Sequence, residues 1–91
     1  MATIADWLKI DAEQVSAALL RVKDRVNGSE GELVLDFSAV LRIDASAITV
    51  LEQLADATST NHAQVALRGV NVDVYKVLKL AKLTTRFTFL N

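Results

Sequence analysis

The sequence predicts one α/β domain over residues 1–91, built as a small mixed, mostly parallel four-stranded sheet covered by helices. Segments with apolar side chains at helical spacing alternate with short strand-like segments, which favours a sheet with helical cover. The two central strand candidates are continuous apolar runs, a pattern typical of strands buried on both faces. A chain of 91 residues with 52% apolar and only 5% aromatic side chains suits a single aliphatic core.

The N-terminal part of the chain predicts a strand followed by a helix. Apolar and polar side chains alternate over residues 7–10, as expected for a strand. Residues 12–26 carry apolar side chains at helical spacing, and Asp11 is the expected N-cap, with Gln14 in the capping-box position. We expect this helix to end at Asn27 and the glycine after it, because both residue types tolerate the left-handed conformation that ends helices.

The middle of the chain predicts a strand, a helix and a second strand. Residues 32–37 contain a short apolar run bounded by turn signals, which indicates a buried strand. The next helix is expected to begin near Asp44, its natural N-cap, and to end in the polar tract 59–62. Residues 65–67 form another short apolar run, which Gly69 closes.

The C-terminal part predicts a third helix and a last strand. Asn71 is the expected N-cap of the helix, and lysines follow in its C-terminal half, where positive charge suits the negative end of the helix dipole. Residues 84–90 alternate polar and apolar side chains, which indicates a strand. The resulting order is β-α-β-α-β-α-β, for which right-handed crossovers are expected.

Composition argues against several classes of function. The net charge of −1 gives no long-range attraction to nucleic acid or to an anionic membrane. No apolar run approaches the roughly 20 residues of a membrane helix, so we expect a cytoplasmic protein without membrane insertion. With no cysteine and one histidine, His62, the sequence offers neither a disulfide scaffold nor a His/Cys metal site, and we expect no cofactor.

The sequence also contains no recognisable catalytic set. Its three glycines form neither of the Gly-rich phosphate-binding patterns. His62 lies in a polar tract, where a solvated surface position is the simpler interpretation. Asp36 and Asp44 form a carboxylate pair, but their spacing implies no fixed geometry for acid–base catalysis. We therefore expect a protein that is not an enzyme.

The most informative stretch is residues 35–48, where a buried strand ends, a loop follows and a helix begins. In open α/β sheets, ligand and partner sites gather at the carboxyl ends of the strands. Ser46 falls in the first helical turn, where free backbone N–H groups and the helix dipole favour a phosphate. Asp44 can accept a hydrogen bond from this hydroxyl and would repel a phosphate beside it. The alternative is structural: Asp44 caps the helix and Ser46 fills an exposed position.

This stretch resembles the central motif of the STAS domain family, the fold of bacterial anti-sigma factor antagonists. In that family a buried strand ends Leu-Asp-hydrophobic-Ser, and a short loop leads to Ile/Val-Asp-Ser-Ser/Thr-Gly at the start of a helix. Here the strand ends in Leu35-Asp36-Phe37-Ser38, and the helix begins with Ile43-Asp44-Ala45-Ser46-Ala47. The strand at residues 65–70 and the helix at residues 72–83 are similar to the family pattern too, so the resemblance covers residues 32–90.

The resemblance implies a small module that regulates transcription by switching between protein partners. In such antagonists a serine or threonine of the motif is phosphorylated by a serine kinase that is also the anti-sigma factor, and the phosphate releases this partner. By position the acceptor is Ser46, with Asp44, Asp36 and Ser38 as its neighbours. Asp11 either matches an acidic residue that lies near the acceptor in the family, or serves only as the helix N-cap.

Two departures from the family motif leave a second possibility open. Ala45 replaces the first serine and Ala47 replaces the usual glycine, so the motif is eroded around the hydroxyl. STAS-like domains also serve as cytosolic subunits of membrane transporters, including lipid-transport ABC systems, where they dock on an ATPase. In that role the hydroxyl of Ser46 need not be phosphorylated.

Under either interpretation, the docking surface is expected on the loop 38–43 and on the outer side of the helix that follows. The residues expected to contact the protein partner are Arg42, Ala47, Thr49, Gln53 and Asp56. The same pattern also fits an ordinary solvated helix face.

Overall fold

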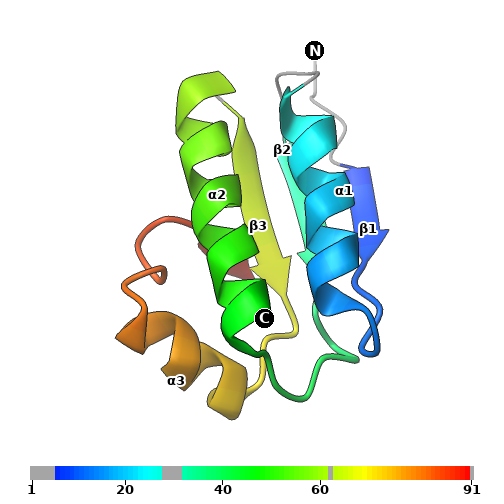
Figure 1. Cartoon of the computed structure of the whole chain (residues 1–91), viewed down its shortest axis with the longest axis vertical. Coiled ribbons are helices and arrows are strands. Elements are labelled where there is room, and N and C mark those ends of the chain that lie inside the picture. The colour runs from blue at the N-terminus through cyan, green and yellow to red at the C-terminus, as the bar shows by residue number, and fades with distance from the viewer. Residues whose placement is uncertain (1–5, 28–31, 62, 91) are drawn as a thin grey trace.

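The fold is known from a computed structural model, which describes residues 6–27, 32–61 and 63–90. Strands and helices alternate along the whole of this range, as the sequence predicts (Figure 1). In chain order the elements are β1 (Asp6–Lys9), α1 (Val15–Asn27), β2 (Glu32–Asp36), α2 (Ala45–Asn61), β3 (Gln64–Arg68), α3 (Val72–Leu80) and β4 (Thr88–Leu90).

The four strands form one sheet in the order β1-β2-β3-β4. The predicted four-stranded α/β fold is confirmed, although all three strand pairs are parallel where a mixed, mostly parallel sheet was expected. Successive strands pair with each other, and right-handed crossovers that always advance in one direction place their helices on the same face. Figure 1 shows α1 and α2 side by side on one face of the sheet, with α3 near the carboxyl ends of the strands.

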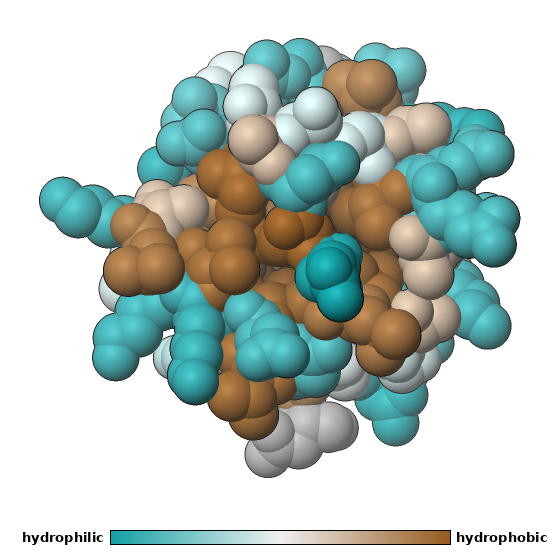
Figure 2. Space-filling view, turned by 60° about the horizontal axis from the view of Figure 1, so that its bottom comes forward, coloured by the Kyte–Doolittle hydropathy of each residue, from teal (hydrophilic) through white to brown (hydrophobic). Residues whose placement is uncertain are grey.

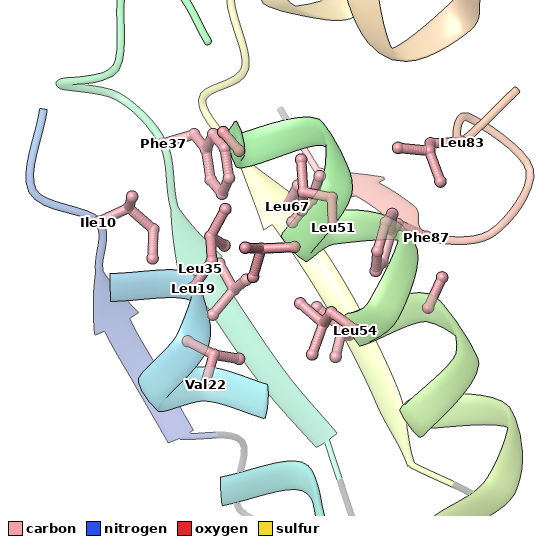
Figure 3. Close-up of a cluster of buried hydrophobic side chains, with 14 of the residues drawn as sticks. Ile10, Leu19, Val22, Leu35, Phe37, Leu51, Leu54, Leu67, Leu83 and Phe87 are labelled. Atoms are coloured by element: carbon pink, nitrogen blue, oxygen red, sulfur yellow. The ribbon is translucent and has the colours of Figure 1, made fainter. Parts of the chain in front are cut away.

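The core fills the space between the sheet and these helices. In Figure 3, side chains from the strands and from α1 and α2 point toward one another in this space. The largest fully buried side chains are Phe37, Ile10, Leu19, Leu35, Leu51, Leu54, Leu67, Leu78, Val26, Val40 and Val74. The core is therefore mainly aliphatic, and each fully buried leucine contributes about 1.5–3 kcal/mol of transfer free energy.

The other face of the sheet is organised around Trp7 and Arg68. The strand register aligns Trp7 with Val34 and Val34 with Ala66, and Val34 and Ala66 stand apart from the core cluster that contacts the helices. Both are nonetheless buried, at 4% and 6% exposure. The Arg68 guanidinium lies 5.0 Å from the centre of the Trp7 ring, so these side chains from β1 and β3 meet over β2.

The start of α1 differs from its prediction. Asp11 Oδ1 accepts a hydrogen bond from Glu13 N at 2.9 Å, and the Asp11 carbonyl accepts one from Gln14 N at 3.2 Å, so Asp11 forms a turn. The helix begins at Val15, and the Gln14 carbonyl accepts the hydrogen bond from Ala18 N. Asp11 as N-cap of a helix over residues 12–26 is therefore wrong, because the carboxylate is used to turn the chain out of β1.

The end of the chain also differs in part. Asn71 caps α3 as predicted, because its Oδ1 accepts a hydrogen bond from Val74 N at 2.8 Å. The last strand covers only Thr88–Leu90 of the predicted segment 84–90. The residues before it form turns, with Arg86 N donating to the Leu83 carbonyl, and Phe87 packs into the core at 7% exposure.

No helix within the described ranges is long and apolar enough to cross a membrane.

Candidate functional site

The candidate site lies at the carboxyl edge of the sheet, where the loops after β1, β2 and β3 meet. Hydrogen bonds between neighbouring segments continue just past the strands: Ile10 N donates to the Asp36 carbonyl at 3.0 Å, and Phe37 N to the Arg68 carbonyl at 2.8 Å. The three loops therefore start side by side. Figure 2 shows the side of the molecule to which this edge belongs, with hydrophobic and hydrophilic side chains intermixed on it.

The start of α2 is fixed by Asp44. Its Oδ1 accepts a hydrogen bond from Ala47 N at 2.9 Å, and its carbonyl accepts one from Ile48 N at 3.1 Å, so the predicted N-cap is confirmed. Ser46 lies in the first turn and is exposed. Its hydroxyl is accessible to another protein, at the end of α2 where the helix dipole favours negative charge.

Asp36 and Ser38, two further motif residues, are joined directly. Ser38 N donates a hydrogen bond to Asp36 Oδ1 at 2.9 Å. Hydrogen bonds from the Ser38 side chain and backbone lower the pKa of Asp36, and the nearby charges of Arg68 and Lys9 act in the same direction. The carboxylate is therefore ionised at neutral pH, and it organises the first residues of the loop after β2.

Gly69 lets the loop after β3 pack against the loop after β2, which contains Ser38. Its φ of +74° lies in the left-handed region, and a Cβ built on it would stand 3.0 Å from the Cβ of Ser38. Only glycine meets both requirements without strain. The sequence suggested a strand end here, but it carried no sign of the close approach to Ser38.

Asn71 also holds the site, in addition to capping α3. Its Nδ2 donates to the Val40 carbonyl at 3.3 Å and to the Leu41 carbonyl at 3.1 Å. The loop 38–43 is thereby tied to the start of α3 across about thirty residues of sequence. This second role was not predicted, because the asparagine cap signal is local and says nothing of a distant loop.

Two shallow cavities show which predicted residues are brought together. Arg42 and Asp44 line a cavity of about 560 Å³ with residues 12–17, so the loop before α2 faces the start of α1. Asp11 instead lines a neighbouring cavity of about 440 Å³ with Ala39. Asp11 therefore belongs to the same edge of the sheet as the motif, on the β1 side of it.

The outer side of α2 presents several of the expected docking residues. Ser46, Thr49, Gln53 and Asp56 are exposed and follow one another at spacings of three and four, so they share one face of the helix. Ala47 does not belong to this face: it is 1% exposed and packs in the core. The prediction that Ala47 contacts the partner is therefore wrong, because its side chain faces the core between α2 and the sheet.

Three of these side chains have contacts within the chain. Thr49 Oγ1 donates to the Ala45 carbonyl at 3.1 Å. Gln53 Oε1 accepts from Nζ of Lys23 on α1 at 3.2 Å. Asp56 forms an ion pair with Arg86 at 3.2 Å, with both side chains well exposed. Exposed contacts of this kind contribute little stability, so a partner can replace them at small cost.

Among the residues that the structure describes, no group of three or more His, Cys, Asp or Glu side chains is arranged to hold a metal ion. His62 lies outside the described residues, as does the predicted glycine at the end of α1.

The comparisons with known proteins agree with the fold. The family model of the STAS domain matches residues 8–91, and none of the curated proteins matches the chain. The crystal structure of a putative anti-sigma factor antagonist, TM1081 from Thermotoga maritima, is similar with a TM-score of 0.68; it is 22% identical and covers 96% of this chain and 73% of that one. The NMR structure of TM1081 is similar with a TM-score of 0.74, at 22% identity over 96% of this chain and 74% of that one.

In the part of the chain that the structure describes, four parallel strands, three helices and loops that converge on a capped helix start define a small α/β domain. The match extends over nearly the whole sequence, and the chain belongs to the STAS domain family. The resemblance seen in the sequence over residues 32–90 is thereby confirmed and extended toward the N-terminus.

Proposed function

We propose that this protein is a phosphorylation-switched protein-binding module of the anti-sigma factor antagonist type, which binds an anti-sigma factor that is also a serine kinase while Ser46 is unphosphorylated. The observation that carries the proposal is the exposed Ser46 in the first turn of α2, and the sequence resemblance matches this serine to the acceptor of the family motif. In this role the protein is a cytoplasmic binding module rather than an enzyme.

The switch follows from charge at the start of α2. A phosphate on Ser46 adds a charge of about −1.5 to −2 at pH 7. The N-terminal end of the helix stabilises such a charge by roughly 0.3–1 kcal/mol, while the Asp44 carboxylate two residues earlier opposes it. Because Ser46 is exposed and Asp44 already caps the helix, the phosphate changes the docking surface without a need to refold the domain.

The proposed docking surface consists of the loop 38–43 and the outer side of α2, with Arg42, Thr49, Gln53 and Asp56 as contact residues. The loop is held in place by Gly69 and Asn71, so its shape is preorganised for a partner. A charge reversal at Asp56 or a lysine at Gln53 should weaken partner binding. Unchanged affinity in both variants would count against this surface.

The direct test is phosphorylation by the cognate serine kinase with ATP. We expect mass spectrometry to find one phosphate on Ser46 and none in Ser46→Ala. Ser46→Asp should bind the partner roughly tenfold more weakly, which corresponds to about 1.4 kcal/mol. Ser59, an exposed serine near the other end of α2, provides the matched control, because Ser59→Ala and Ser59→Asp should leave labelling and affinity unchanged. Normal partner release by Ser46→Ala would refute the switch at this residue.

A second candidate is a cytosolic subunit that docks on the ATPase of a lipid-transport ABC system. The observation that favours it is the pair of alanines, Ala45 and Ala47, which flank the hydroxyl where the family motif has serine and glycine. Co-purification with a transporter ATPase, together with unchanged binding by Ser46→Ala, would support this candidate. Co-purification with a serine kinase would decide against it.

A further inference from the structure

The outer face of α3 exposes an unusual amount of apolar surface. Val72 is 69% exposed, Tyr75 42% and Leu80 85%. Leu41, in the loop before α2, is 72% exposed. None of these side chains is required for the core, which α3 contacts through Val74 and Leu78 on its opposite side.

These side chains belong to one surface. Val72 and Leu80 are eight residues apart on α3, so they lie on the same side of the helix with Lys76 between them. Val72 and Tyr75 line a shallow cavity of about 290 Å³ together with Phe89. Leu41 joins the surface because its carbonyl accepts a hydrogen bond from Asn71, the residue directly before Val72.

The charge around this surface is positive. Lys76 and Lys79 are exposed on the same side of α3 as the apolar side chains. Residues 72–90 contain four Lys or Arg and one Asp, whereas residues 1–71 contain six Lys or Arg and ten Asp or Glu. The three lysines of this segment lie on α3 and in the turn that ends it, where Asp73 is the one acidic residue of the helix, while Arg86 pairs with Asp56. Fields of this kind favour a partner of opposite charge.

We infer that the outer face of α3 and the neighbouring Leu41 form a second docking surface for an acidic protein segment that carries apolar side chains. This α3 surface consists of Leu41, Val72, Tyr75, Lys76, Lys79 and Leu80. Lysines at the rim attract the acidic groups, and the exposed Val72, Tyr75 and Leu80 bury the apolar ones. The α3 surface meets the first docking surface only at Leu41 in the loop 38–43, and it includes neither Ser46 nor the outer side of α2. A STAS domain of this form can therefore hold one partner through α3 while another is bound or released at Ser46.

The test uses a defined probe and the ¹⁵N-labelled full chain. The probe is a synthetic peptide of about 16 residues, long enough for marginal helix formation, with leucines at helical spacing flanked by glutamates. A matched peptide carries glutamines in place of the glutamates. We expect the acidic peptide to shift the amide signals of residues 41 and 72–80 in a saturable manner, and added salt to weaken its binding because the charges are exposed.

Variants of the α3 surface separate its charge from its apolar part. The double variant Lys76→Gln with Lys79→Gln should lower the affinity for the acidic peptide roughly three- to tenfold. Leu80→Ser should lower this affinity by a similar factor. The matched control is Leu20→Ser with Arg21→Gln, since Leu20 is 46% exposed on α1 and far from α3 in sequence. This control should bind like the unaltered chain.

Several outcomes would overturn the inference. These are no binding of the acidic peptide, signal changes on the outer side of α2 with none at residues 72–80, equal binding of the glutamine peptide, or binding to phosphatidylserine vesicles without binding to the peptide. Ser46→Asp should leave peptide affinity unchanged. Loss of the Ser46 switch with intact peptide binding would therefore refute the proposed function alone.

Discussion

Lys82 occupies a backbone position that favours glycine, which makes Lys82→Gly a stringent test of how α3 ends. Its φ is +62°, in the left-handed region. Lys82 N donates to the Lys79 carbonyl at 3.0 Å and Leu83 N to the Leu78 carbonyl at 2.9 Å, the two hydrogen bonds of a Schellman motif. Leu78 and Leu83 are both buried, so the motif is held by packing at each end.

The expected effect of Lys82→Gly is a gain in stability. A non-glycine residue in the left-handed conformation costs roughly 1–2 kcal/mol. Replacing lysine with glycine removes this cost, but it also destabilises the fold by about 0.4–1 kcal/mol because glycine raises the entropy of the unfolded chain. The net gain is therefore about 0.5–1 kcal/mol, and for a chain of this size 1 kcal/mol raises Tm by roughly 4–8 °C.

The assay is urea unfolding followed by circular dichroism, supported by thermal scans of the same samples. Two controls separate the backbone effect from others. Lys82→Gln removes the charge but keeps the β-carbon, so its stability should stay within about 0.5 kcal/mol of the parent. Lys76→Gly, inside α3, should destabilise by about 1 kcal/mol. If Lys82→Gly loses stability as Lys76→Gly does, the reasoning from the left-handed end of α3 is refuted.

Two further predictions concern the loop after β2. Gly69→Ala should destabilise the fold by more than about 1 kcal/mol, because it adds a β-carbon at a φ of +74° and 3.0 Å from the Cβ of Ser38. The double variant with Ser38→Gly should recover part of this loss in urea unfolding, and no recovery would contradict the contact. The pKa of Asp36 is lower in the folded than in the unfolded chain. Its carboxylate therefore stabilises the fold at any pH above its pKa in the unfolded chain, and this contribution is lost as the pH falls through its pKa in the folded chain. Asp36→Asn should therefore flatten the decline of the unfolding free energy below about pH 4, and Ser59→Ala, which alters no titratable group, should keep the parent's profile.

The parts of the fold that could be predicted from the sequence depend on neighbouring residues. The apolar runs of β2 and β3 can be recognised from a few consecutive residues. The caps Asp44 and Asn71 each accept a hydrogen bond from an amide three residues ahead. Ser46 could therefore be placed in a first helical turn. Ala47 was misplaced although a signal existed: its spacing of four and seven residues from Leu51 and Leu54 puts it on the buried side of α2.

Other features could not be predicted because they depend on what the chain meets in space. Asp11 has the residue type and spacing of a helix cap, but the chain must first turn out of β1, and the carboxylate is used there. The last strand is shortened because the chain turns after α3 and buries Phe87 before it reaches β3. At Asp11 and at residues 84–87 the local pattern fits both the predicted and the observed structure, and packing selects the observed one.

Sequence patterns alone predict the order of strands and helices, the aliphatic core, the family and the capped helix start that carries Ser46. The elements, the core and the helix cap follow from periodicity and from hydrogen bonds between residues a few positions apart, whereas the family follows from the resemblance of the motif. Packing in three dimensions sets which loops share the edge of the sheet, the contact of Gly69 with Ser38, and the hydrogen bond from Asn71 at the start of α3 to Leu41. These contacts join residues about thirty positions apart, and their geometry exists only once parallel strands have paired and their crossovers have packed.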